Sequence, residues 1–297
     1  MNTARGIALG LLLITVSCSG ERSASRSADE AASAKRPPQR IVSLIPSATE
    51  IIVALGAAER LVARSDYDVD PALAHLPSVG PGLSPNLEQL TVLQPDLVIA
   101  WPDNPSRSLI GRLSDLGVEI YTPQVQTLAD IKGTARELGR ILGVEPAAES
   151  LVTSVEAELE ALRTAVAGRE RPAVFYVVWY DPPTTTGAGT YIHELIEIAG
   201  GRNVFEDAPG LWPRVSLEEV VRRQPDVLLL SQTEENPIDI ELLSSAVGWR
   251  ELGAVRDGKV VPVDANLFNR PGPRVAEAAR RLAQLLHPAA FPDPRAR

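Results

Sequence analysis

A ten-residue pattern occurs twice in this chain of 297 residues, 130 positions apart. Residues 87–96 and residues 217–226 both begin with Leu-Glu and both end with Gln-Pro-Asp. In each copy a capping residue, Asn86 or Ser216, stands before the pattern, and an apolar run typical of a buried strand follows it. A single helix and strand of this kind could arise by chance. Two copies in register favour two similar lobes of common origin.

The surrounding sequence predicts that both lobes are of the α/β class. In the first half, apolar runs predict strands within 40–45, 61–63, 96–101 and 118–121, and helices at 47–55 and 106–116. A capping box from Ser47 to Glu50 is expected to open the first helix, and Gly56 to end it. The second half repeats this order, with strands expected at 173–178 and 226–230 and a helix at 191–199.

One long helix is expected between the halves. Residues 145–167 contain no glycine or proline after Pro146, and their apolar residues recur at helical spacing. The predicted organisation is an N-terminal lobe at 40–144, a connecting helix at 145–170 and a C-terminal lobe at 171–297. We therefore predict two Rossmann-like lobes joined by a single long helix, with a ligand cleft between them that changes little on binding.

Charge and composition exclude several classes of function. The chain has 29 basic and 38 acidic residues and a net charge of −9, so it lacks the basic surplus that nucleic-acid binding requires. A single cysteine cannot form an internal disulfide, and three histidines without a paired motif give no zinc site. The expected partners therefore exclude nucleic acid, and no metal ligands or catalytic residues are assigned.

The N-terminus has the features of an export signal. Arg5 precedes an apolar run at 7–16 that is too short to cross a bilayer, so residues 1–17 are expected to be a signal peptide. The residues before Cys18 resemble the lipobox of bacterial lipoproteins, which implies that Cys18 is acylated. The alternative is an ordinary signal peptide with an incidental cysteine. Residues 18–39 then form a flexible tether that holds the protein to a membrane.

Aromatic residues concentrate in the loops that follow the expected strands. In open α/β sheets these loops bind ligands, because they lie at the carboxyl ends of the strands. The candidates for ligand contact are Tyr67, Trp101, Tyr180, Trp212 and Phe268. Trp212 is the strongest of them, because no strand contains it. For each aromatic, packing in the core is an alternative role.

Two glutamates stand apart from the other acidic residues. Glu88 and Glu218 occupy matching positions at the starts of the two repeated helices. Two explanations fit these glutamates equally well. One is a favourable interaction with the helix dipole, and the other is docking to a partner that has two-fold symmetry. The chain contains neither the P-loop motif nor the nucleophile-elbow motif, so we expect a protein that is not an enzyme.

Taken together, the motifs resemble a known family, the helical-backbone substrate-binding proteins of ABC importers, and within it the cobalamin-binding branch. The motifs that carry the resemblance are residues 40–50 (Arg-Ile-Val-Ser-Leu-Ile-Pro-Ser-Ala-Thr-Glu), 79–80 (Val-Gly), 85–88 (Pro-Asn-Leu-Glu), 94–101 (Gln-Pro-Asp-Leu-Val-Ile-Ala-Trp), 211–213 (Leu-Trp-Pro) and 270–274 (Arg-Pro-Gly-Pro-Arg). The resemblance implies that Tyr67 and Trp212 contact a corrinoid from opposite lobes.

The resemblance also implies roles for other residues. The loop from Asp264 to Arg270 would line the cleft, and Glu88 and Glu218 would form salt bridges with arginines of the two permease subunits. Gly82 stands where the cobalamin-binding branch has a tryptophan, which implies a missing aromatic wall and room for a differently shaped ligand.

The resemblance implies a monomeric, lipid-anchored extracytoplasmic receptor. It would bind cobalamin or a related corrinoid as cargo, need no cofactor, and deliver the ligand to a permease dimer with its ATPase, on the periplasmic side or the cell surface. One alternative is a haem or ferric-siderophore receptor that uses Arg202, Arg214, Arg270 and Arg274 for an anionic chelate. Another is a two-lobed subunit of a metal-dependent enzyme.

Overall fold

The structure of this protein is a computed structural model that describes residues 36–102, 107–115, 117–234 and 237–291. The predicted signal peptide and Cys18 lie outside these residues. The chain from Pro38 onward groups into one compact unit, which begins two residues before the start predicted for the folded body. None of the helices in the described residues is long and apolar enough to cross a membrane.

The first half of this unit is built on a parallel four-stranded sheet in the order β2-β1-β3-β4. All the strands predicted for this half are present; β2 has the predicted length, and the other three are shorter than their apolar runs. The elements are β1 (Ile41–Ser43), α2 (Pro46–Ala54), β2 (Leu61–Ala63), α3 (Leu87–Leu93), β3 (Leu97–Ile99), α4 (Arg107–Asp115), β4 (Glu119–Tyr121) and α5 (Leu128–Leu142), with 3-10 turns at Ala58–Arg60 and Pro71–Leu73.

The second half repeats this sheet. Its order is β10-β9-β5-β8, again parallel, and a separate hairpin is formed by β6 and β7. Its elements are β5 (Ala173–Val177), β6 (Trp179–Tyr180), β7 (Pro183–Thr184), α7 (Tyr191–Ile198), β8 (Arg202–Asn203), α8 (Leu217–Arg223), β9 (Val227–Gln232), α9 (Ile240–Ser245), α10 (Gly253–Arg256), β10 (Val260–Asp264), α11 (Ala265–Phe268) and α12 (Val275–Leu286), with 3-10 turns at Trp249–Glu251 and Pro288–Ala290. In both sheets the first strand lies between the second and the third, which confirms the predicted repeat.

The repeated helices α3 and α8 match in local detail. The side chain of Asn86 accepts a hydrogen bond from the Gln89 amide at 3.1 Å, and that of Ser216 accepts one from the Glu219 amide at 3.2 Å. Each helix ends at a glutamine in the left-handed region, Gln94 with φ 45° and Gln224 with φ 42°. Both capping predictions are confirmed.

The predicted capping box of the first helix is wrong. Helix α2 begins at Pro46, which suits the first helical position because its missing N–H has no intrahelical partner there. Ile45 is the capping residue, with no side-chain hydrogen bond to the helix, and Ser47 lies inside the first turn. Glu50 is therefore available for a contact elsewhere.

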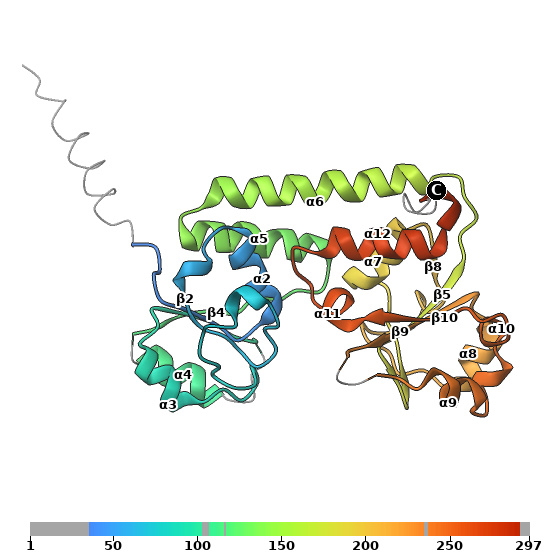
Figure 1. Ribbon diagram of the computed structural model, residues 1–297, viewed down its shortest axis with the longest axis horizontal. Helices are drawn as coiled ribbons and strands as arrows, with labels where there is room; N and C mark the ends of the chain where they lie inside the picture. Colours follow the sequence, from blue (N-terminus) through green and yellow to red (C-terminus); the bar gives the residue numbers. More distant parts are fainter. Residues whose placement is uncertain (1–35, 103–106, 116, 235–236, 292–297) are drawn as a thin grey trace, which may run out of the picture. The chain divides into compact units, whose positions relative to one another are not determined.

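The connecting helix α6 (Glu145–Val166) packs on both halves of the unit. At about 1.5 Å per residue its 22 residues span roughly 33 Å. Its earlier residues, such as Val152, lie in the core with α2 and α5, and its later ones, such as Leu159, lie in the core with α7 and α12. Figure 1 shows α6 alongside α5 and α12.

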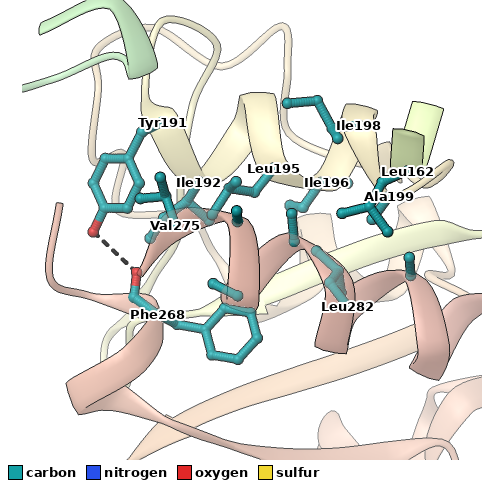
Figure 2. Close-up of a cluster of buried hydrophobic side chains, with 14 of the residues drawn as sticks. Leu162, Tyr191, Ile192, Leu195, Ile196, Ile198, Ala199, Phe268, Val275 and Leu282 are labelled. Atoms are coloured by element: carbon teal, nitrogen blue, oxygen red, sulfur yellow. Dashed lines mark hydrogen bonds between the residues drawn. The ribbon is translucent and has the colours of Figure 1, made fainter. Parts of the chain in front are cut away.

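The core is divided by the two sheets. One cluster fills each face of each sheet, and Figure 2 shows the largest, where Leu195 and Ile196 of α7 meet Val275 and Leu282 of α12. Leu128, in the first turn of α5, also belongs to this second-half cluster. A second helix therefore spans both lobes, in addition to the predicted connecting helix.

Candidate functional site: the cleft between the lobes

Two adjoining cavities lie between the lobes. Their volumes are about 340 and 300 Å³, and both are lined by Ser47, Leu83, Trp101 and Pro271. The first extends toward residues 123–126, and the second toward Tyr67 and the loop after β10. Because both lobes contribute to the second cavity, this is the inter-lobe cleft predicted from the sequence.

The lining residues follow the carboxyl ends of parallel strands. Trp101 follows β3, Ser47 follows β1, and residues 123–126 follow β4. Neighbouring strands β1 and β3 are connected in opposite directions along the sheet, and open α/β sheets bind ligands at such a switch point. The position of the cleft thus follows from the sheet order.

Trp101 is the central aromatic of the cleft. It lines both cavities and is 37% exposed, and its indole Nε1 lies 3.6 Å from the position that a Cβ on Gly82 would occupy. Such a Cβ would lie 2.1 Å from the carbonyl oxygen of Leu44. A larger side chain at position 82 therefore does not fit this backbone, and Trp101 supplies the aromatic surface next to it.

Hydrogen-bonding side chains on the cleft wall belong to an ordered network. The Tyr176 hydroxyl donates to Asn269 Oδ1 at 2.7 Å, and Asn269 Nδ2 donates to Ser231 Oγ at 2.7 Å. Burial raises the pKa of Tyr176, so its phenol stays protonated and acts as a donor. Asn269, which lines the second cavity, is thus held in place by hydrogen bonds to side chains of β5 and β9.

The arginines proposed for an anionic chelate are already paired in part. Arg270 and Arg274 both hold the carboxylate of Glu50 on α2, at 3.3 and 3.0 Å. Arg270 lines the second cavity, whereas Arg214 forms a β-bridge with Thr184. The four arginines do not form one cluster.

The structure separates the other predicted ligand residues. Tyr180 lines a separate groove with Trp249, and Asp264 caps α11 by accepting a hydrogen bond from the Asn266 amide at 2.8 Å. The ring of Phe268 is buried in the core, where Tyr191 donates to its backbone carbonyl at 3.0 Å (Figure 2). Phe268 therefore lies in the core and in the lining of neither cavity.

Trp212 lies on an exposed loop and not in the lining of either cavity. The carbonyls of its neighbours Leu211 and Pro213 accept hydrogen bonds from Gly187 and Thr185, at 2.8 and 3.0 Å. Helix α8 begins five residues after Trp212, at Leu217. Of the predicted set, the cleft brings together Tyr67, Trp101 and Arg270.

A family comparison agrees with this geometry. The periplasmic binding protein family matches residues 41–267, which include both sheets and most of the cleft. The chain belongs to the periplasmic binding protein family. It is thus a binding protein of the kind that serves ABC importers, and not an enzyme.

Individual relatives of this periplasmic binding protein are described as binding different tetrapyrroles. A vitamin B12-binding protein of Vibrio cholerae is 33% identical to this chain, and the match covers 84% of this chain and 90% of the relative. A crystal structure of a vitamin B12-binding protein from the same organism has a TM-score of 0.70 at 31% identity. That match covers 87% of this chain and 100% of the solved one. A periplasmic haem-binding protein from Roseiflexus has a TM-score of 0.74 at 27% identity, covering 85% and 99%. An uncharacterised ABC transporter substrate-binding lipoprotein of Bacillus subtilis is 30% identical over 87% and 83%.

The predicted docking glutamates of this periplasmic binding protein are both exposed at the starts of α3 and α8. Among the described residues, neither Glu88 nor Glu218 forms a salt bridge. The neighbouring Glu219, by contrast, is held by Arg222 and Arg223 at 2.5 and 2.6 Å. Hydrogen bonds from these two guanidinium groups lower the pKa of Glu219 to about 2.

Sequence reasoning singled out none of the amide side chains of the cleft, although the loop from Asp264 to Arg270 was expected to line it. Gln124 and Gln126 line the first cavity, and Asn266 and Asn269 line the second. The rule that ligand loops follow strand ends pointed to both segments, but their amides belong to no recognisable motif. Their convergence depends on the sheet order and on how the lobes are placed.

Proposed function

We propose that this protein binds cobalamin or a related corrinoid in the inter-lobe cleft and delivers it to an ABC permease. The observation that carries the proposal is the chemistry of the cleft wall. Trp101, Leu83 and the prolines provide apolar surface, while Gln124, Asn266 and Asn269 provide amides. A corrin ring has broad apolar faces and a rim of amide side chains, so both kinds of surface have a partner.

Calorimetric titration of the full chain tests this proposal, with cyanocobalamin, cobinamide, hemin and a ferric hydroxamate as separate ligands. Trp101→Ala should weaken corrinoid binding by roughly ten- to a hundredfold, because it removes aromatic burial in both cavities. Trp179→Ala is the matched control, since Trp179 lies on the β6–β7 hairpin and lines neither cavity. Corrinoid binding that survives Trp101→Ala unchanged would remove the cleft from the proposal.

The same titration decides the roles of Tyr67 and Trp212. Tyr67 lines the second cavity, and we propose that its ring contacts the ligand from the first lobe. The loop of Trp212 lies outside both cavities, so Trp212→Ala should weaken binding less than Trp101→Ala does. A larger loss in Trp212→Ala would show that the ligand extends from the cleft onto that loop.

Haem is the second candidate ligand, and Tyr67 is the observation that favours it. Its side chain is 57% exposed at the second cavity, and a phenolate is a known axial ligand of haem iron. Hemin binding with a Soret shift that disappears in Tyr67→Phe would select haem. If the parent protein does not respond to hemin, and corrinoid binding persists in Tyr67→Phe, haem is excluded as the ligand.

We propose further that Glu88 and Glu218 dock the two permease subunits. Their exposure, their matching positions on α3 and α8, and their availability for pairing support this role. Glu88→Arg combined with Glu218→Arg should abolish capture of the permease while leaving cyanocobalamin affinity unchanged. Glu160→Arg on α6 makes one such charge reversal at a salt-bridged site of another helix and should leave docking intact. Loss of cyanocobalamin affinity in the double variant would contradict the assigned roles.

The membrane anchor is proposed at Cys18, which lies outside the described residues. The lipobox-like residues before Cys18 and the lipoprotein among the relatives support it. Mass spectrometry of the membrane-bound protein should find an acylated N-terminal cysteine. An unmodified N-terminus beyond residue 18 would show that the chain is released by an ordinary signal peptidase.

A further inference from the structure

Two sequence motifs, residues 40–50 and residues 270–274, contact each other across the lobes. Ligand binding by itself does not explain why the charged residues of these motifs meet. Glu50 lies on α2 in the first lobe, and Arg270 and Arg274 flank a Pro-Gly-Pro turn between α11 and α12 in the second. Arg270 Nη1 contacts Glu50 Oε1 at 3.3 Å, and Arg274 Nη2 and Nε contact Oε1 and Oε2 at 3.0 and 3.2 Å. Both oxygens of the carboxylate are engaged by the opposite lobe. We call these three residues the clasp.

Partial burial makes the clasp more effective than a surface ion pair. The side chains of Glu50 and Arg270 are 17% and 13% exposed, and that of Arg274 is 40% exposed. Limited water access strengthens charge-assisted hydrogen bonds and makes the loss of the carboxylate costly for two guanidinium groups at once.

Arg270 also holds an element of the ligand cleft. Its Nη2 donates to the backbone carbonyl of Tyr67 at 2.7 Å and to Asn266 Oδ1 at 2.6 Å. Tyr67 belongs to the first lobe, whereas Asn266 belongs to the second, and both line the second cavity. One guanidinium group thus connects Glu50 to the Tyr67 loop.

The turn between the arginines packs directly on α2. A Cβ on Gly272 would lie 3.4 Å from the carbonyl oxygen of Ser47 and 3.3 Å from Glu50 Oε2. Pro271, next to it, lines both cavities. The clasp therefore lies against the wall of the cleft.

We propose that Glu50, Arg270 and Arg274 are positioning residues that set the spacing of the lobes and hold the Tyr67 loop at the cleft. Opening the clasp frees the Tyr67 carbonyl and separates the Pro-Gly-Pro turn from α2, so the cleft widens. This inference does not depend on which ligand the cleft binds.

Spin-label distances between the lobes test the proposal directly. Cys18→Ser removes the only native thiol, and Val92→Cys on α3 with Leu242→Cys on α9 places labels at exposed positions of opposite lobes, 77% and 69% exposed. The distance distribution should be narrow in this background. Glu50→Ala should broaden it and move it to longer distances, and Glu50→Gln should do so less because the amide keeps one acceptor.

Glu158→Ala is the matched control. It removes an exposed salt bridge between α6 and α12, with Arg280 at 3.0 Å, and should leave the distances unchanged. A distribution in Glu50→Ala that matches Glu158→Ala would overturn the proposal. If Glu50→Ala does not fold, the distance distributions of Glu50→Gln and Arg274→Lys are compared with that of Glu158→Ala instead.

Ligand release gives a second readout. In Glu50→Gln, cyanocobalamin should dissociate about tenfold faster or more. A variant with a truncated core residue and the same thermal midpoint as Glu50→Gln should dissociate at close to the parent rate. Dissociation that becomes equally fast in the core-truncation variant would contradict a positioning role. If neither cyanocobalamin nor hemin binds the parent protein, the ligand proposal fails, and the spin-label distances still decide the clasp.

Discussion

At the scale of single residues, Gly82 determines how closely its loop approaches β1. A Cβ at this position would lie 2.1 Å from the Leu44 carbonyl oxygen, and the contact is with backbone, which cannot rotate away. Gly82→Ala should therefore lower the free energy of unfolding by about 1–3 kcal/mol, measured by urea denaturation. Gly111→Ala on α4 is the control, because no described atom outside its own stretch of helix lies within 4 Å of its Cβ position. This substitution should be neutral or stabilising by up to about 1 kcal/mol. Equal effects of the two substitutions would contradict the packing argument.

Glu219 gives a pH-dependent prediction. Because its pKa is lowered to about 2 in the folded protein, its ionised form stabilises the fold above the ordinary carboxyl range, and this contribution is lost as the pH falls through about 2. The thermal midpoint of Glu219→Gln should lie below that of the parent protein at neutral pH, and the difference should shrink progressively between pH 5 and pH 2. Glu218→Gln, which removes no salt bridge among the described residues, should show no such trend. A constant difference for Glu219→Gln would rule out this linkage.

At the scale of elements, α3 and α8 end alike but are held differently. Gln94 and Gln224 both adopt a left-handed conformation that is unfavourable for a residue with a Cβ. The side chain of Gln224 accepts a hydrogen bond from the Gly253 amide at 3.1 Å, which ties α8 to α10. The repeat thus preserves the backbone conformation, and in α8 the glutamine side chain adds a contact to α10.

Glycine substitutions should separate these two effects. Gln94→Gly should stabilise the protein by about 0.5–1 kcal/mol in chemical denaturation, since it relieves the backbone penalty. Gln224→Gly should gain less or destabilise, because it also leaves the Gly253 amide without its side-chain acceptor. A larger gain for Gln224→Gly would mean that the hydrogen bond contributes nothing to stability.

At the scale of the whole compact unit, helices α5 and α6 couple the lobes. The α5 residue Leu128 packs in the second-lobe core, and its amide donates to the Glu194 carboxylate at 2.6 Å. Together with the clasp and the shared helix α6, this contact joins the lobes at several points. A limited opening of the cleft on ligand binding remains our prediction.

Unfolding should therefore be cooperative across both lobes. Leu162→Ala on α6 removes a side chain that is 3% exposed in the second-lobe core, and should cost about 2–5 kcal/mol. We expect one urea transition at a lower midpoint, coincident in far-UV circular dichroism and tryptophan fluorescence. Two separated transitions would show that the lobes unfold independently.

Much of the fold could be predicted from local sequence signals. The repeat at 87–96 and 217–226, the caps at Asn86 and Ser216, and the apolar period of α6 each depend on neighbouring residues, so they were readable without a structure. Ser47 to Glu50 match the sequence pattern of a capping box, but no capping box forms there, because Pro46 already begins the helix.

The side-chain roles in the cleft depended on contacts across long stretches of sequence. Loop position identified Tyr67 and Trp101 as candidates and the resemblance added Arg270, but Phe268 shares the loop position of the two aromatics and packs in the core. Glu50 and Arg274 are 224 residues apart, and no periodicity records that they share a salt bridge. The sequence alone determined two similar α/β lobes and the strand ends that face a cleft, because hydrophobic periodicity and helix capping depend on neighbouring residues. Only the tertiary structure decided which polar groups meet in the cleft, because their partners come from the opposite lobe.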